Sequence, residues 1–130
     1  MSEENIEVVR SAFAAFQAGD MSGVTELMAD DLVTHRVDPD NAQFRGKEGF
    51  FQALADWTED FEDWTATPED FIDTGEAVLV QVHQTARGAF SGVSVDSHFW
   101  FVFTVCDGSI SRLAFHTRKA TALEAAGVSE

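Results

Sequence analysis

The sequence predicts an α+β fold, with a bent antiparallel sheet that carries helices on one face. Helical periodicity is concentrated in the first half of the chain, and the alternating pattern of strands dominates the second half. No internal repeat or low-complexity linker interrupts this order. At 130 residues the chain has the length of one domain, so we expect a single domain over residues 1–130.

The first half is predicted to hold two long amphipathic helices. In residues 3–18 apolar side chains recur at helical spacing, and Gly19 follows where a helix C-cap is expected. Residues 47–64 form the second helix, with an apolar stripe of Phe50, Leu54, Trp57, Phe61 and Trp64. The segments between them are predicted to be, in order, a short helix at 22–29, a strand at 32–37, a turn at 38–41 and a loop at 43–46.

The second half is predicted to be a meander of strands. Pro68 cannot donate a backbone hydrogen bond, so residues 65–73 form an edge strand at best. Residues 77–87 form a long strand, and residues 93–118 form a hairpin. A short helix over residues 119–126 closes the chain.

The hairpin at residues 93–118 turns through Asp107-Gly108 in one of two registers. A two-residue loop would set Phe99 opposite His116, whereas a three-residue loop with a bulge would set Phe99 opposite Phe115. A slip of one residue moves a whole strand to the other face, so matching of apolar side chains favours the second register. In that register His98 faces His116 on the opposite side of the sheet.

Composition excludes several classes of function. The 23 acidic and 8 basic residues give a formal charge of −15, which leaves no basic stripe for nucleic acid. No apolar run approaches the length of a membrane span, and the polar N-terminus is not a signal peptide, so we expect no membrane partner. The single cysteine excludes an internal disulfide framework and favours a cytoplasmic location.

Three sequence segments resemble one protein family in the expected order. They are ENIEVVRSAFAAFQAGDMSGVTELMADDLVTH at the start, RGKEGFFQAL in the middle, and FVFTVCDGSISRL with ATALEAAG at the end. The chain resembles the SnoaL-like branch of the nuclear-transport-factor-2-like superfamily, the cone-shaped fold shared with ketosteroid isomerase. The resemblance implies a deep apolar pocket between the concave face of a curved sheet and the helices. It also implies a homodimer through the outer face of the sheet, and no cofactor or metal.

The catalytic groups of the family's known enzymes are largely missing. Ketosteroid isomerases carry a base just after the first strand, where this chain has Arg36, with Asp38 two residues later. Their tyrosine on the first helix is replaced near Ala12, and their second acid falls in the apolar row at 99–103. Polyketide cyclases use a carboxylate in the last strand region, but residues 110–117 contain none. Ketosteroid isomerisation is therefore not expected, and the cyclase interpretation is weakened.

Arg36 and Asp38 are nevertheless the candidate catalytic residues, with Thr34 as a polar neighbour. Thr34 and Arg36 share the parity of Leu32, which we expect to face inward. Arg36 could bind a carboxylate or enolate oxygen of a ligand, but it is more simply an arginine at the pocket mouth that pairs with an acidic side chain. Asp38 could act as a base if apolar surroundings raised its pKa, although its segment is also an ordinary turn.

The predicted pocket walls are apolar, and a metal site is not expected. His83, His98 and His116 lie on strands that could be adjacent, but their spacing matches no metal-ligand motif. The side chains predicted to line the pocket are Phe13, Leu54, Trp57, Phe99, Phe101, Leu113 and Phe115.

Two functions remain open. The first is a protein that binds or converts a small apolar molecule with a carbonyl or carboxylate, by isomerase- or cyclase-type chemistry if it is an enzyme. The second is a non-catalytic dimeric ligand-binding or interaction module. A closed core with Asp38 in solvent would favour the interaction module.

Overall fold

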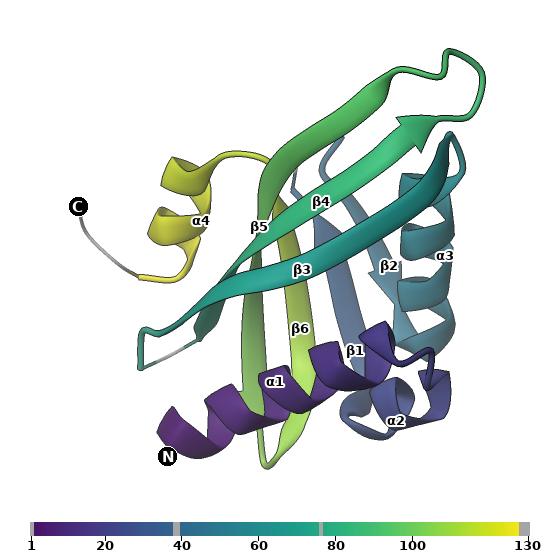
Figure 1. The fold of residues 1–130 in the computed structure, drawn as a ribbon. Coiled ribbons are helices and arrows are strands. Elements are labelled where there is room, and N and C mark those ends of the chain that lie inside the picture. Colours follow the sequence, from purple (N-terminus) through teal and green to yellow (C-terminus); the bar gives the residue numbers. More distant parts are fainter. Residues whose placement is uncertain (1, 38–39, 76, 128–130) are drawn as a thin grey trace.

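The computed structural model describes residues 2–37, 40–75 and 77–127 (Figure 1). Helices come early and strands late, which confirms the α+β class. No helix among these residues is long and apolar enough to cross a membrane. The elements in chain order are α1 (Ser2–Gln17), α2 (Met21–Glu26), β1 (Met28–Arg36), β2 (Ala42–Arg45), α3 (Gly46–Thr58), β3 (Phe61–Asp73), β4 (Val78–Gly88), β5 (Ser94–Cys106), β6 (Ser109–His116) and α4 (Lys119–Ala125).

The six strands form one sheet in the order β2-β1-β6-β5-β4-β3. Neighbouring strands are antiparallel except β1 and β6, which run parallel. The sequence order did not reveal this parallel pair, because β1 and β6 are separated by most of the chain. Pro68 lies on β3, which is an edge strand as predicted, and the pairing with β4 shifts just after it.

Helices α1 and α3 pack on one face of the sheet, here called the inner face, and α4 packs on the outer face (Figure 1). The inner core joins Val9 and Phe13 of α1 to the strand residues Val80, Phe99 and Leu113. A smaller core on the outer face joins Leu123 of α4 to strand residues that include Leu79, Val102 and Ala114. The C-terminal helix is thus the exception to the expectation that the helices share one face.

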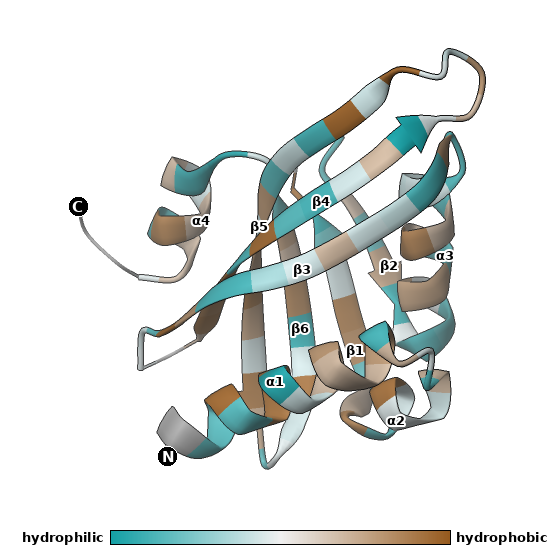
Figure 2. Cartoon of the chain, viewed as in Figure 1, coloured by the Kyte–Doolittle hydropathy of each residue, from teal (hydrophilic) through white to brown (hydrophobic). Residues whose placement is uncertain are grey.

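Alternation along β5 explains why both faces are apolar. Its odd residues face α1 and α3, whereas Val102 faces α4. Figure 2 shows hydrophilic and hydrophobic bands that alternate along this strand near the loop that joins it to β4. Burial follows the same rule, since Phe99 and Phe103 are buried while His98 is exposed.

Helix α3 ends at Thr58, whereas the apolar stripe predicted a helix to residue 64. Phe61 and Trp64 belong instead to β3. Four acidic residues at 59–63 follow the helix, and no basic residue occupies its last turn. Negative charges at the negative end of a helix are unfavourable, so this composition works against further helix. A loop is predicted at residues 43–46, but residues 42–45 pair with β1 as strand β2.

The β5–β6 hairpin has a two-residue turn followed by a bulge. Asp107 and Gly108 both have positive φ, 53° and 79°, as a type I′ turn requires. The register then shifts after Thr104, which brings Phe101 opposite Phe115. Neither predicted register is therefore correct. The predicted sharing of one face by the odd residues of both strands holds nevertheless.

Candidate ligand-binding site

Two neighbouring cavities lie between the helices and the inner face of the sheet. The first has a cavity volume of about 60 Å³ and lies within about 460 Å³ of space that is free of protein atoms and partly open to solvent. The second, toward α1 and α2, has a cavity volume of about 70 Å³ within about 520 Å³ of such space. The lining of the first is Thr34, Arg36, Phe50, Ala53, Leu54, Trp57, Trp64, Phe99, Phe101, Leu113 and Phe115. Five residues line both cavities, namely Phe50, Leu54, Trp64, Phe101 and Leu113.

Aromatic side chains form the wall of the first cavity. The ring of Trp57 on α3 packs against Phe115 of β6, with centroids 4.5 Å apart. Phe99 on β5 lies beside Phe115 at 4.9 Å and beside Phe101 at 5.0 Å. Such edge and tilted contacts are favourable ring geometries, so the wall is a packed cluster rather than loose side chains.

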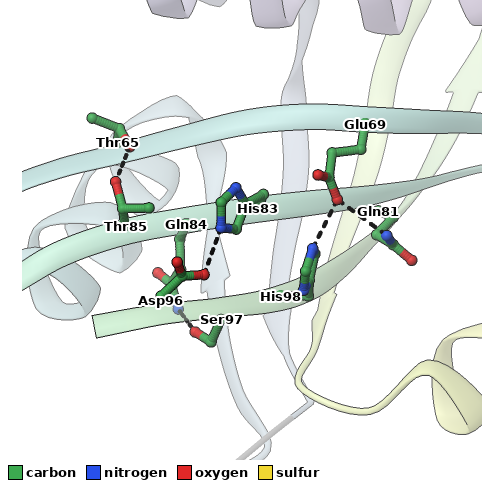
Figure 3. Close-up of polar contacts among 9 residues, drawn as sticks. All are labelled: Thr65, Glu69, Gln81, His83, Gln84, Thr85, Asp96, Ser97 and His98. Atoms are coloured by element: carbon green, nitrogen blue, oxygen red, sulfur yellow. Dashed lines mark hydrogen bonds and ion pairs between the residues drawn. The ribbon is translucent and has the colours of Figure 1, made fainter. Parts of the chain in front are cut away.

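A buried glutamine holds two of these aromatic side chains. Gln84 on β4 is 5% exposed. Its Oε1 accepts hydrogen bonds from the indole nitrogens of Trp57, at 3.1 Å, and Trp64, at 2.9 Å. Its Nε2 donates to the hydroxyl of Ser97 on β5, at 3.1 Å (Figure 3). Gln84, itself on β4, therefore joins α3 to β3 and β5.

Thr34 is a polar residue in an otherwise apolar part of the lining. It lies on β1, opposite Leu113 of β6 and Phe44 of β2, and is only 5% exposed. Its Oγ1 is buried and has no hydrogen-bond partner. An unpartnered buried hydroxyl costs free energy, so it marks a place where a ligand atom could bind.

Arg36, two residues along β1, lies at the rim of the same cavity. Its Nε donates to Asp40 Oδ1 at 2.9 Å, and its Nη2 donates to Oδ2 at 2.7 Å. The hydrogen bonds that Arg36 donates to Asp40 raise the pKa of Arg36 and lower the carboxyl pKa of Asp40. Of the two predicted arrangements, the structure shows the arginine paired with an acidic side chain.

The predicted wall residues all line one of the two cavities. Trp57, Phe99 and Phe115 line the first, Phe13 lines the second, and Leu54, Phe101 and Leu113 line both. Asp38, the predicted base, lies outside the described residues.

Three important lining or supporting residues were missed at the sequence level. The sequence pattern predicts Phe50 and Trp64 only as members of a helical stripe, and it assigns no role to Gln84. The available signal for Gln84 was its parity with Val78, Val80 and Val82, the inward residues of the same strand.

His83 and His98 are cross-strand neighbours on the outer face, the side of the sheet opposite the aromatic wall. Figure 3 shows the two side chains with their partners. Their rings stack with centroids 5.0 Å apart. His83 Nε2 lies 2.6 Å from Asp96, and His98 Nε2 lies 2.8 Å from Glu69. The predicted pairing of His98 with His116 is wrong, because the hairpin register places Trp100 opposite His116.

His116 has different neighbours, and the three histidines do not converge. Its Nδ1 lies 3.0 Å from the hydroxyl of Thr121 in the first turn of α4. Among the residues that the structure describes, no group of three histidine, cysteine, aspartate or glutamate side chains could hold a metal ion.

Comparison with known proteins identifies the relatives of this fold. Residues 9–113 match the family model of the SnoaL-like domain. No curated protein matches the chain by sequence. The confirmed features are the resemblance to SnoaL-like proteins and the cone-shaped fold of the nuclear-transport-factor-2-like and ketosteroid-isomerase-like proteins.

Three solved structures illustrate the similarity. A protein from Jannaschia sp. CCS1 that is described as a SnoaL-like polyketide cyclase is 21% identical. The alignment covers 99% of this chain and 95% of that chain, with a TM-score of 0.77. Bal32a from a soil-derived mobile gene cassette is 23% identical, with 95% and 96% covered and a TM-score of 0.76. TerC, crystallised with polyporic acid, is 20% identical, with 95% and 98% covered and a TM-score of 0.75. At these identities the similarity shows the fold alone.

Proposed function

The chain belongs to the SnoaL-like family, and on that premise we propose that its inner cavity binds a small, mostly apolar molecule that carries an oxygen atom. The aromatic wall around Trp57 and Phe99 would contact the apolar body of the ligand. Thr34 and Arg36 would supply the polar contacts. The polyketide-cyclase description of a structural relative is consistent with a ligand of this kind.

The observation that carries this proposal is the hydroxyl of Thr34. A side chain that served only to fill the core would be apolar at this position, because burial of an unpartnered hydroxyl is unfavourable. Because Oγ1 is itself buried, the Thr34 side chain would turn this hydroxyl toward the cavity to meet a ligand oxygen. The surrounding lining is otherwise apolar apart from Arg36 and the indole nitrogens, so this hydroxyl would fix the orientation of the ligand.

We propose binding without acid–base catalysis as the primary role. Among the described residues that line the first cavity, Arg36 is the only ionisable one, and Asp40 already pairs with it. Isomerase- or cyclase-type chemistry needs a group that takes and returns a proton. Arginine remains protonated in proteins and is unsuited to that task. Asp38 stays the candidate for such a group.

Binding can be tested by equilibrium dialysis against naphthalene and 1-naphthol, which differ by one hydroxyl group. We expect both to bind, and 1-naphthol to bind about fivefold more tightly, the value of one net hydrogen bond. Thr34→Val keeps the shape of the side chain and should remove this difference. Thr104→Val, on the outer face, is the matched control and should preserve it. Absence of binding of both compounds to the wild type would refute the proposal.

We also propose that the chain forms a homodimer through the outer face of the sheet. A hollow lies there between the sheet and α4, bordered by Val37, Thr104, Arg112 and Ala125. Trp100 is half-buried on the same face. Val102 and Ala114 on this face are buried against α4, so a second copy would contact the remainder of the face.

A further inference from the structure

The ion pair between Arg36 and Asp40 at the rim of the cavity affects which ligand charge the site can accommodate. We infer that the site selects neutral, oxygen-bearing aromatic molecules over carboxylates, and that Asp40 is the residue that determines this specificity. The inference rests on the proposed binding function. It narrows the ligand class, because an arginine beside an apolar cavity would otherwise favour a carboxylate.

The pair with Asp40 occupies the Nε–Nη2 edge of the Arg36 guanidinium group and neutralises its charge. Asp40 receives hydrogen bonds from both Nε and Nη2 of Arg36, which is the fork that binds a carboxylate most strongly. The Cζ atom of Arg36 also lies 5.2 Å from the ring centroid of Phe44, which positions the guanidinium group. The side chain of Arg36 is 15% exposed and that of Asp40 is 51% exposed. The carboxylate of the pair therefore lies on the solvent side and the arginine on the cavity side.

The local charge opposes an anionic ligand. Arg36 and Asp40 together carry no net charge, and the carboxylate of Asp56 on α3 also acts electrostatically on Arg36. The whole chain has a formal charge of −15. A carboxylate entering the cavity would lose its hydration without gaining a free positive charge, which is unfavourable in apolar surroundings.

A neutral ligand oxygen can form a hydrogen bond with the hydroxyl group of Thr34. A hydroxyl group can donate to a carbonyl oxygen or accept from a ligand hydroxyl. The buried Oγ1 of Thr34 has both capacities unused. Satisfying this atom requires no charge, so a phenol, alcohol or ketone on an aromatic body fits the site better than an acid does.

The experiment measures dissociation constants of 1-naphthol and 1-naphthoate by equilibrium dialysis at neutral pH, where the acid is ionised. The wild type should bind 1-naphthol at least about tenfold more tightly than 1-naphthoate, because only the latter brings an unpaired charge. Asp40→Asn keeps the shape of the side chain and frees the charge of Arg36. It should strengthen naphthoate binding about five- to tenfold, with naphthol changed less than about twofold.

Asp107→Asn is the matched control. It removes the same charge, and Asn suits the positive φ of 53° at this exposed turn. The turn precedes β6, whereas Arg36 is opposite Phe115 near the far end of that strand, so this variant should leave both constants unchanged.

The outcomes separate the two proposals. Binding of 1-naphthol with no discrimination against 1-naphthoate would overturn the inference and leave the binding function standing. The same holds if Asp40→Asn gains no more naphthoate affinity than Asp107→Asn. Failure of 1-naphthol and naphthalene alike to bind the wild type would overturn both.

Discussion

The indole nitrogen of Trp57 donates a hydrogen bond to the side-chain oxygen of Gln84, at 3.1 Å. Trp64 donates to the same oxygen, at 2.9 Å. Gln84→Met retains the length of the side chain but removes this acceptor. Because two indole groups would lose their partner in a largely buried site, we expect the free energy of unfolding to fall by about 2 kcal/mol or more. Urea denaturation monitored by tryptophan fluorescence measures this loss.

Gln81→Met is the control for Gln84→Met. Gln81 lies on the same strand, and its Oε1 accepts from one indole group, that of Trp100, at 3.2 Å. It faces the outer side, where water can replace the lost bond, so we expect a loss below about 1 kcal/mol. Equal losses for the two variants would show that Gln84 is not a special support of the cavity.

Trp57→Ala tests the packing of α3 on the sheet. Trp57 packs against Phe115 and Phe99 in the cavity wall, so truncation removes the ring contacts between the helix and two strands. Changes from a large aromatic residue to alanine in a core cost about 3–5 kcal/mol, and the partial exposure of Trp57 favours the lower end. Differential scanning calorimetry should show a clear fall in the melting temperature. An unchanged melting temperature would contradict the aromatic wall described above.

The strand and helix patterns predicted most of the fold because they depend on local periodicity. The edge position of β3 followed from Pro68, and the common face of the odd hairpin residues followed from alternation. The predicted end of the second long helix at residue 64 was wrong, because the spacing of Phe61 and Trp64 fits both a helical stripe and an inward-facing strand. Asp63, which lies between these two residues, has a non-helical φ of 54°, and the pairing of β3 with β4 shifts there.

Alternation along the strand predicted which site residues face inward. The hydrogen-bond and ion-pair partners of those residues could not be predicted from the sequence. Thr34 and Arg36 were placed on the inner face because they alternate with Leu32. The partner of Arg36 could not be chosen from sequence, since 23 acidic residues were available. The role of Gln84 depends on two tryptophans from α3 and β3, whose approach is a property of the tertiary structure.

Glu69 should titrate below the ordinary range of a glutamate. Its pKa is lowered first by the hydrogen bond that Gln81 donates and further by His98 and His83 (Figure 3). A carboxyl group whose pKa is lower in the folded state stabilises the fold above its unfolded pKa. That contribution is lost as the pH falls through the folded value. Carbon-13 NMR titration of the Glu69 carboxyl measures the shift.

Gln81→Met provides the matched comparison for this titration. It removes the first cause of the low pKa and retains both histidines, so the Glu69 pKa should rise toward its ordinary value. A Glu69 pKa that is the same in the two proteins would show that the amide hydrogen bond does not set it.

The proposed homodimer predicts different effects for two alanines of α4. Ala125 borders the outer-face hollow, whereas Ala120, near the start of the same helix, does not. Ala125→Glu would bring two like charges together across a two-fold contact, so we expect the dimer dissociation constant to rise at least about tenfold. Ala120→Glu adds the same charge and should leave the constant unchanged. Sedimentation velocity over a concentration series measures both. A wild type that sediments as a monomer would refute the dimer, and a dimer unaffected by Ala125→Glu would place the contact elsewhere.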